Sequence, residues 1–206
     1  GRLRFSVDAL GDVSETRYDG AGRATQSLTY GTVIAVSTAI QNGTATEASF
    51  STFVTANESA ARSSMVVFDA AGRAVYTLAK DDNGLAIVSK QVFDAIGRVI
   101  AHVDYANTIA YTAGQTAAQV AGLLGVDTPS TQHLTRYVYD VEGRLRFTID
   151  DSGAVTEQRY DTLGRVASTR QYMTPISVGT VTEASVAAAV ATQNQVHRVD
   201  NGYDAA

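Results

Sequence analysis

The stretch Tyr139-Asp140-Val141-Glu142-Gly143-Arg144, with the alternating residues that follow it up to Asp150, decides the fold. An Asp at the start of a turn can accept hydrogen bonds from its own turn, and a Gly three residues later takes the left-handed conformation at little cost. A type I turn followed by a left-handed Gly is a common hairpin connection. The stretch therefore predicts a tight turn that leads directly into a β-strand.

The residues after this turn alternate between apolar and polar side chains, as a half-buried strand requires. The alternation places one set on the buried face and the other on the opposite face. The apolar set is Leu145, Phe147 and Ile149, and the opposing set is Arg144, Arg146 and Thr148.

The pattern aromatic-Asp-x-x-Gly-Arg recurs along the chain in five full copies. Because such self-similarity is the signature of repeat architectures, it dominates the prediction of the fold. The copies are Tyr18, Asp19, Gly22 and Arg23; Phe68, Asp69, Gly72 and Arg73; Phe93, Asp94, Gly97 and Arg98; Tyr139, Asp140, Gly143 and Arg144; and Tyr160, Asp161, Gly164 and Arg165. The sequence also begins with Gly1-Arg2 and ends with Tyr203-Asp204-Ala205-Ala206, the halves of a sixth copy, so we expect a piece of a longer array.

A larger period lies above the motif, because Gly1, Gly72 and Gly143 are 71 residues apart. It divides the chain into large repeats at 1–71, 72–142 and 143–206. Each large repeat holds two hairpin motifs and one insertion, and a second Asp-x-x-Gly turn follows its first strand. These turns begin at Asp8, Asp81 and Asp150, and the insertions are 31–64, 106–134 and 173–198.

The insertions are rich in Ala, Thr and Ser, and each contains a helix-start signal. Thr44 to Glu47 and Thr180 to Glu183 fit the capping box, and Thr116 to Gln119 is a weaker version. Apolar residues at helical spacing follow, which predicts helices near 45–62, 116–125 and 182–192. A flexible Ser/Thr-rich linker is the alternative.

The connections between strands are too short for parallel crossovers, so consecutive strands must pair as antiparallel hairpins. A single hairpin buries only one face and needs stacked neighbours for stability. We therefore predict a mainly β fold with short helical insertions, in which tandem antiparallel hairpins form a solenoid-like or spiralling sheet.

The repeated aromatic-Asp-x-x-Gly-Arg motif resembles the YD repeat of the Rhs family. This family includes Rhs polymorphic toxins, shell-forming proteins of insecticidal toxin complexes, and teneurins. The resemblance implies long antiparallel sheets that spiral into a shell, which encloses a toxic polypeptide in the toxins. It also implies a secreted or cell-surface location, in a bacterium. The helical insertions depart from the usual family pattern, and the motif residues carry over as fold determinants only.

Little in the sequence indicates catalytic chemistry. Cysteine is absent, and the three histidines fit no zinc spacing. The acidic turns at 81–84 and 150–153 lack the spacing of an EF-hand calcium loop, so plain turns are the better interpretation. We expect no enzyme activity, no cofactor and no bound metal. The net charge of −5 without a basic stripe argues against nucleic acid, and no apolar run is long enough to span a membrane.

Two functions remain open at this stage. The first is a structural scaffold that forms a rigid wall, shell or stalk and encloses or displays other domains. The second is an adhesin-type module whose insertions contact glycan or protein. The expected partners are neighbouring repeats of a longer chain, with an enclosed toxin domain or a cell-surface glycan or protein as candidates.

Overall fold

The computed structural model describes residues 1–125, 132–177, 179–194 and 196–203. The described residues form thirteen strands and four short α-helices, with antiparallel pairing, which confirms the predicted mainly β class. The chain divides into two compact units. The N-terminal unit comprises Gly1–Lys90 with Asn107–Val126, and the C-terminal unit comprises Gln91–Ala106 with Asp127–Ala206.

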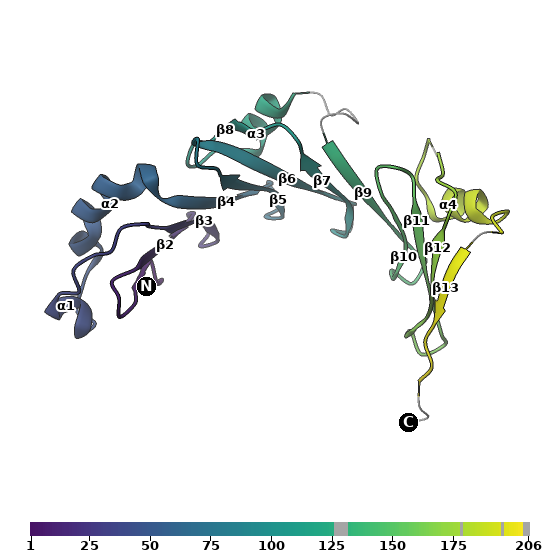
Figure 1. Cartoon of the computed structure of the whole chain (residues 1–206), viewed down its shortest axis with the longest axis horizontal. Helices are drawn as coiled ribbons and strands as arrows, with labels where there is room; N and C mark the ends of the chain where they lie inside the picture. The colour runs from purple at the N-terminus through teal and green to yellow at the C-terminus, as the bar shows by residue number, and fades with distance from the viewer. Residues whose placement is uncertain (126–131, 178, 195, 204–206) are drawn as a thin grey trace. The chain divides into compact units, whose positions relative to one another are not determined.

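The strands of the N-terminal unit pair antiparallel in sequence order, β1 to β6, and β8 pairs with β6 (Figure 1). This order follows from connections that are hairpin turns or local insertions. The strands are β1 (Phe5–Val7), β2 (Val13–Tyr18), β3 (Ala24–Thr29), β4 (Arg62–Phe68), β5 (Ala74–Lys80), β6 (Leu85–Phe93) and β8 (Ile109–Ala110).

The C-terminal unit repeats the arrangement, with the strand order β7-β9-β10-β11-β12-β13 and antiparallel pairing throughout. Its strands are β7 (Val99–Tyr105), β9 (Gln132–Tyr139), β10 (Leu145–Ile149), β11 (Val155–Tyr160), β12 (Val166–Tyr172) and β13 (Val196–Asp200).

The three expected helical regions are present. They are α2 (Ser51–Asn57) with the flanking 3-10 turns η1 (Glu47–Phe50) and η2 (Glu58–Ala60), α3 (Ala117–Leu124), and α4 (Glu183–Val190). A further short helix, α1 (Thr38–Gln41), was not predicted, because it has only four residues and buries none of them. The part of the middle insertion at 126–131 lies outside the described residues.

Two of the three predicted helix caps are wrong by two residues. The structure places the caps at Thr46 and Thr182, whose reciprocal partners are Ser49 and Ser185, whereas Thr116 caps α3 with Gln119 as expected. The amide of Thr182 donates to Ser185 Oγ at 2.9 Å, and the amide of Ser185 donates to Thr182 Oγ1 at 3.1 Å.

The physical reason for the shift lies in the two glutamates that were expected to close the boxes. Glu47 and Glu183 are instead the first residues of η1 and α4, and they form ion pairs with Arg4, just before β1, and with Arg146 of β10. A carboxylate in the first helical turn is also favoured by the helix dipole.

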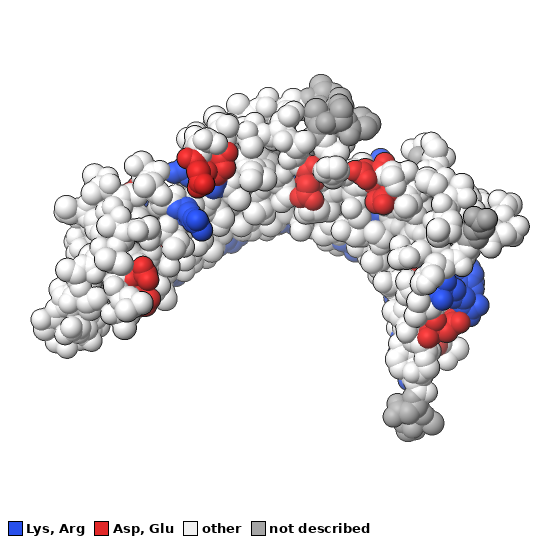
Figure 2. Space-filling model, in the orientation of Figure 1, with Lys and Arg blue, Asp and Glu red and all other residues white. Residues whose placement is uncertain are grey.

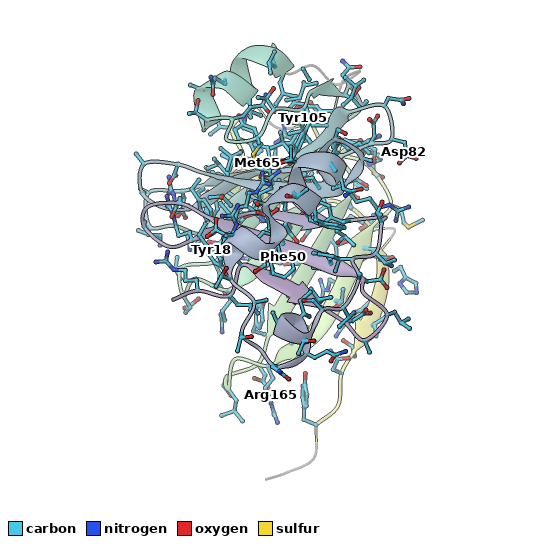
Figure 3. All side chains as sticks on the ribbon, turned by 90° about the vertical axis from the view of Figure 1, so that its left-hand side faces the viewer. Tyr18, Phe50, Met65, Asp82, Tyr105 and Arg165 are labelled. Carbon is cyan, nitrogen blue, oxygen red and sulfur yellow. The ribbon has the colours of Figure 1, made fainter. Side chains whose placement is uncertain are left out.

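Each unit has an apolar core between one face of its strands and its helical insertion. In the N-terminal unit, Phe50 of η1 stacks on Phe5 with ring centroids 4.6 Å apart, and Figure 3 shows Phe50 against the N-terminal strands. Burying one such side chain contributes about 1.5–3 kcal/mol. The core of the C-terminal unit consists of Val138, Phe147, Ile149, Val155, Tyr172, Val186 and Val190.

The expectation that Arg146 faces away from Phe147 is wrong. The pairing of β10 with β9 shifts register between Leu145 and Phe147, which is a β-bulge. A bulge re-aims a side chain because it breaks the strict two-residue alternation. Arg146 Nη2 consequently lies 3.3 Å from Oε1 of Glu157, a residue directly opposite Phe147 and 1% exposed.

The cap assignment can be tested with two matched threonines. Thr182→Ala should lower the free energy of unfolding by about 1 kcal/mol, because it removes the side-chain acceptor at the start of α4. Thr180→Ala, at the position that the sequence pattern favoured as the cap, should change it by less than about half of that. Urea denaturation monitored by circular dichroism measures both, and an equal or larger loss in Thr180→Ala would contradict the assignment.

Candidate functional site

The five full motif copies adopt one turn geometry, in which the Asp binds both ends of its own turn. Its N–H donates to the carbonyl oxygen of the Arg at 2.9–3.0 Å, and the Gly N–H donates to the Asp carbonyl oxygen at 2.9–3.1 Å. Its Oδ1 accepts the Arg backbone N–H at 2.8–2.9 Å, and its Oδ2 accepts the Arg Nε–H at 2.7–2.8 Å. One carboxylate therefore closes the turn and fixes the guanidinium.

The Gly of each copy takes a φ between 77° and 89°, the left-handed region that side chains with a Cβ rarely adopt. At Gly22 a Cβ would also meet the guanidinium of Arg2, but this is the exposed end of a flexible side chain that can move aside, so the left-handed φ is what requires glycine there.

The motif copies contact one another through the Arg of one copy and the aromatic ring of the next. Arg144 Cζ, for example, lies 4.6 Å from the ring centroid of Tyr160. A guanidinium over an aromatic face is a cation–π contact worth about 0.5–2 kcal/mol. The other such pairs are Arg2 over Tyr18 at 5.5 Å, Arg23 over Phe68 at 4.3 Å, Arg98 over Tyr139 at 4.6 Å, and Arg165 over Tyr203 at 4.2 Å.

Where the aromatic residue is Tyr, its hydroxyl adds a second link to the preceding copy. Tyr160 Oη donates to the carbonyl oxygen of Leu145, the residue after Arg144, at 2.6 Å. The same bond joins Tyr18 to Leu3 at 2.8 Å, Tyr139 to Val99 at 2.7 Å and Tyr203 to Val166 at 2.9 Å. We call the combined series of Arg–aromatic and Tyr–carbonyl contacts the motif ladder.

The motif ladder was not predicted from the sequence, although all of its residues were singled out. The pattern showed that each copy has an aromatic residue at its start and an Arg at its end. The pattern did not show that the Arg of one copy contacts the aromatic residue of the next copy. The structure thus joins the predicted residues within each copy and also from one copy to the next.

The motif aspartates are ionised well below neutral pH. At Asp140, burial acts to raise the pKa, but hydrogen bonds from the backbone and guanidinium of Arg144 outweigh it, so the pKa is lowered. At Asp161 the backbone and side-chain hydrogen bonds of Arg165 lower the pKa. The carboxylates therefore act as fixed acceptors at neutral pH.

A second polar cluster, which sequence reasoning missed, surrounds a fully buried carboxylate in the N-terminal unit. Glu15 is 0% exposed. Its oxygens accept from Tyr30 Oη at 2.5 Å and from Arg17 Nε at 2.8 Å, and Arg4 Nη2 lies at 2.9 Å. Burial favours the neutral acid, yet these donors outweigh it and lower the pKa of Glu15. Burial and the nearby Glu15 also raise the pKa of Tyr30.

The two arginines around Glu15 continue to the helical insertion. Arg17 Nη1 donates to Glu58 of η2 at 2.6 Å, and Arg4 pairs with Glu47 of η1. The cluster therefore joins two strands to the insertion that covers them, and we call it a glutamate clamp.

The C-terminal unit contains an equivalent glutamate clamp around Glu157. Tyr172 Oη donates to Glu157 at 2.7 Å and Arg159 Nε at 3.0 Å, while Arg146 links Glu157 to Glu183 of α4. A signal for this clamp was present in the sequence, because Arg4, Glu15, Arg17 and Tyr30 recur 142 residues later, at twice the large period.

The middle large repeat has no glutamate at this place. Glu15 and Glu157 lie seven residues before the motif glycines Gly22 and Gly164, and the residue seven before Gly97 is Lys90. Lys90 pairs with Tyr76 as Glu15 pairs with Phe5. A cation thus stands at the position of the clamp carboxylate in this repeat.

The hollows of the C-terminal unit are lined by side chains that are already paired. One hollow of about 460 Å³ adjoins the glutamate clamp and the turn after β9. Its lining includes Asp140, Arg144, Arg146, Arg159, Tyr160 and Glu183. Across the described ranges, no three His, Cys, Asp or Glu side chains gather as a metal site, and no helix is long and apolar enough to span a membrane.

Comparisons with known proteins place the fold but not the family. No family model matches the chain, and no curated protein matches it. Among solved structures, the chain is similar to a crystal structure of TcdB2-TccC3-Cdc42, with a TM-score of 0.51 and 15% identity over 86% of this chain and 8% of that one. A Tc holotoxin pore of Photorhabdus luminescens gives 0.52 and 13% identity over 84% of this chain and 7% of that one. TcdB2-TccC3 without its hypervariable C-terminal region gives 0.50 and 16%, over 83% and 7%.

These likenesses concern the arrangement of the backbone. The TM-scores of 0.50–0.52 show a shared fold, and the identities of 13–16% show nothing beyond it. The chain spans less than a tenth of the length of these three chains. The matching chains belong to Tc toxin complexes.

The role of the motif as a folding device is testable at Asp140 and Gly143. Asp140→Ala removes the acceptor for both the amide and the guanidinium of Arg144, so we expect a loss of about 1 kcal/mol or more in unfolding free energy. Gly143→Ala, at a φ of 82°, should separately lower the free energy of unfolding by about 1 kcal/mol or more. Asp140→Asn, which keeps one acceptor, is the matched control and should lose less.

The same variants separate this role from calcium binding. Thermal melts of the wild type should coincide in calcium and in chelator. A calcium-dependent rise of the melting temperature that disappears in Asp140→Ala would contradict the folding role.

The lowered carboxyl pKa values predict sensitivity to acid. Glu15, Glu157 and the motif aspartates bind protons more readily in the unfolded chain than in the fold, so their stabilisation is complete above about pH 4–5, the unfolded range, and is lost as pH falls through the lower folded values. Urea unfolding at a series of pH values should show this decline. Glu157→Gln should be less stable at pH 7 and should decline less steeply. A stability that rises on acidification would contradict the assignment.

Proposed function

We propose that this chain is a segment of a structural wall built from YD-type repeats, within a large secreted or cell-surface bacterial protein. On this proposal its three large repeats, 1–71, 72–142 and 143–206, are successive wall units with a structural, non-catalytic role. The wall forms a shell or stalk that encloses or displays other domains.

The observation that carries the proposal is the motif ladder. Its Asp and Arg side chains are bound inside their turns, and the Arg and Tyr side chains are bound again to the neighbouring copy. Polar groups arranged for a ligand would be left open, whereas these are used to join one hairpin to the next. Such neighbour-to-neighbour contacts are the way in which repeat proteins build extended, rigid structures.

The backbone similarity to chains of Tc toxin complexes supports the same function. Together with the repeated motif, it favours membership of the YD/Rhs class, although the helical insertions are an addition to the plain pattern. By analogy, the proposed partners are neighbouring repeats of the same longer chain and an enclosed toxin domain. This part of the proposal rests on fold-level analogy.

Electron cryo-microscopy of the complete protein that contains this segment tests the proposal. We expect its hairpins to continue the strand order of adjacent repeats in the wall of a shell or stalk. A matched variant with Arg98, Arg144 and Arg165 replaced by Gln should weaken this wall, because it removes the charge from three consecutive rungs of the motif ladder.

Two results would overturn the wall proposal. One is a segment that stands apart from its neighbours as a separate domain. The other is saturable binding of a defined glycan that is lost on changes in the insertions alone, which would favour the adhesin function instead.

A further inference from the structure

One row of side chains differs between the two units in a way that neither the motif nor the wall function explains. In the C-terminal unit this row runs across the strands, on the face that α4 covers in part. It consists of Val138, Phe147, Glu157, Arg170 and Arg198, each directly opposite the next. The corresponding row of the N-terminal unit is Phe5, Glu15, Leu28 and Ser63.

Arg170 therefore stands where the N-terminal unit has Leu28, which is 1% exposed. The Nε of Arg170 is buried without a hydrogen-bond partner. Directly opposite Arg170 on β13 lies Arg198. Like charges that face each other on paired strands destabilise a sheet, and a buried N–H without a partner adds a further cost.

The nearby carboxylates are already engaged. Both oxygens of Glu157 interact with other donors, namely Arg146, Arg159 and Tyr172. Asp200 accepts from Arg198 Nε at 2.7 Å on the exposed edge of β13. Of the two carboxylates beside this pair of arginines, Glu157 is thus bound by other donors and Asp200 is bound by Arg198.

The equivalent place in the N-terminal unit shows what this part of the sheet accommodates. There a later segment of the chain crosses the row, and Tyr111, which follows β8, reaches it. Tyr111 Oη lies 2.5 Å from Ser63 Oγ and 3.1 Å from Gln26 Nε2. The position is thus a docking place for a polypeptide segment that bonds to the polar side chains of β3 and β4.

In the C-terminal unit the three receiving residues are Ser168, Arg170 and Arg198, in place of Gln26, Leu28 and Ser63. We propose that these three residues form a docking site for an acidic polypeptide segment, whose carboxylate binds between the two guanidiniums. The segment would lie as the Tyr111 segment lies in the N-terminal unit. This proposal concerns a partner and does not depend on the wall function.

The choice of occupant follows from charge complementarity. A guanidinium pairs with a carboxylate through two parallel N–H donors, and Arg170 is only half-buried, so the end of its guanidinium can receive such a partner. The chain as a whole carries a charge of −5, so attraction of an acidic peptide must come from a local group of cations. Figure 2 shows such a local basic patch beside β13, next to an acidic one.

Fluorescence anisotropy on the complete chain tests the site, with a short labelled peptide of alternating Glu and Ser as the probe. We expect saturable binding at low salt and none of a Gln/Ser peptide. Arg170→Leu and Arg198→Ser, which restore the residues of the N-terminal unit, should each weaken binding at least about tenfold, as expected for loss of one partner of a charge pair. Arg62→Ser, an exposed arginine of β4 in the N-terminal unit, is the matched control and should bind as the wild type does.

The stability of the variants gives a second readout. Arg170→Leu should raise the melting temperature of the chain alone, because it removes the like-charge pair and the buried N–H. The proposal is overturned if the acidic peptide does not bind, if Arg62→Ser weakens binding as much as Arg170→Leu, or if sulfate displaces the peptide better than chloride at equal ionic strength, which would indicate a simple anion site.

Discussion

The guanidinium of the motif Arg is shared between two hairpins, and the rest of the sheet depends on this sharing. Its Nε edge is held by the Asp of its own turn, and its flat face covers the aromatic ring of the next copy. The two uses do not compete, because one needs the edge of the group and the other its plane. A Lys could not replace it, since an ammonium has neither the fork of donors nor the flat face. Each turn thus becomes part of the surface on which the next hairpin forms.

The glutamate clamps solve a different problem, which is how an insertion is held on the sheet. A buried carboxylate is costly unless its oxygens are fully paired, and Glu15 meets that condition with three donors: Arg17 of its own strand, Arg4 just before β1 and Tyr30 just after β3. Its arginines then reach the insertion, so the clamp fixes the position of the helix as well as its own charge. The middle repeat has Lys90 at the corresponding position, seven residues before its motif glycine Gly97, so the carboxylate is absent there. The clamp is thus one means of attachment, and the fold does not require it.

The strands and turns were predictable because their determinants are local. Each Asp140-type turn contains its own acceptors and its own Gly, and period-two alternation marks the strand that follows. The errors arose where a distant partner overrides a local pattern. Glu183 fits a capping box by spacing, but Arg146, 37 residues away, forms an ion pair with it, and the box is closed by Thr182 and Ser185. Arg146 itself breaks the alternation of buried and exposed side chains because of a β-bulge. The spacing of the residues around Arg146 gives no sign of this bulge. The motif ladder escaped prediction for the same reason, since its contacts join one copy to the next.

The two kinds of position in this chain therefore carry different information. The motif residues are constrained on two sides, by their own turn and by the next copy, so a change at one of them weakens two hairpins. The residues of the row across the strands are constrained only by the segment that packs over them, so they vary between the units. Leu28 of the N-terminal unit is replaced by Arg170 in the C-terminal unit, while the neighbouring motif turns keep the same hydrogen bonds. A repeat of this kind can therefore change which segment it binds without a change in its motif turns. Recognition in such arrays should thus be sought in the rows and in the insertions that cross them, where one substitution alters a surface and leaves the motif ladder intact.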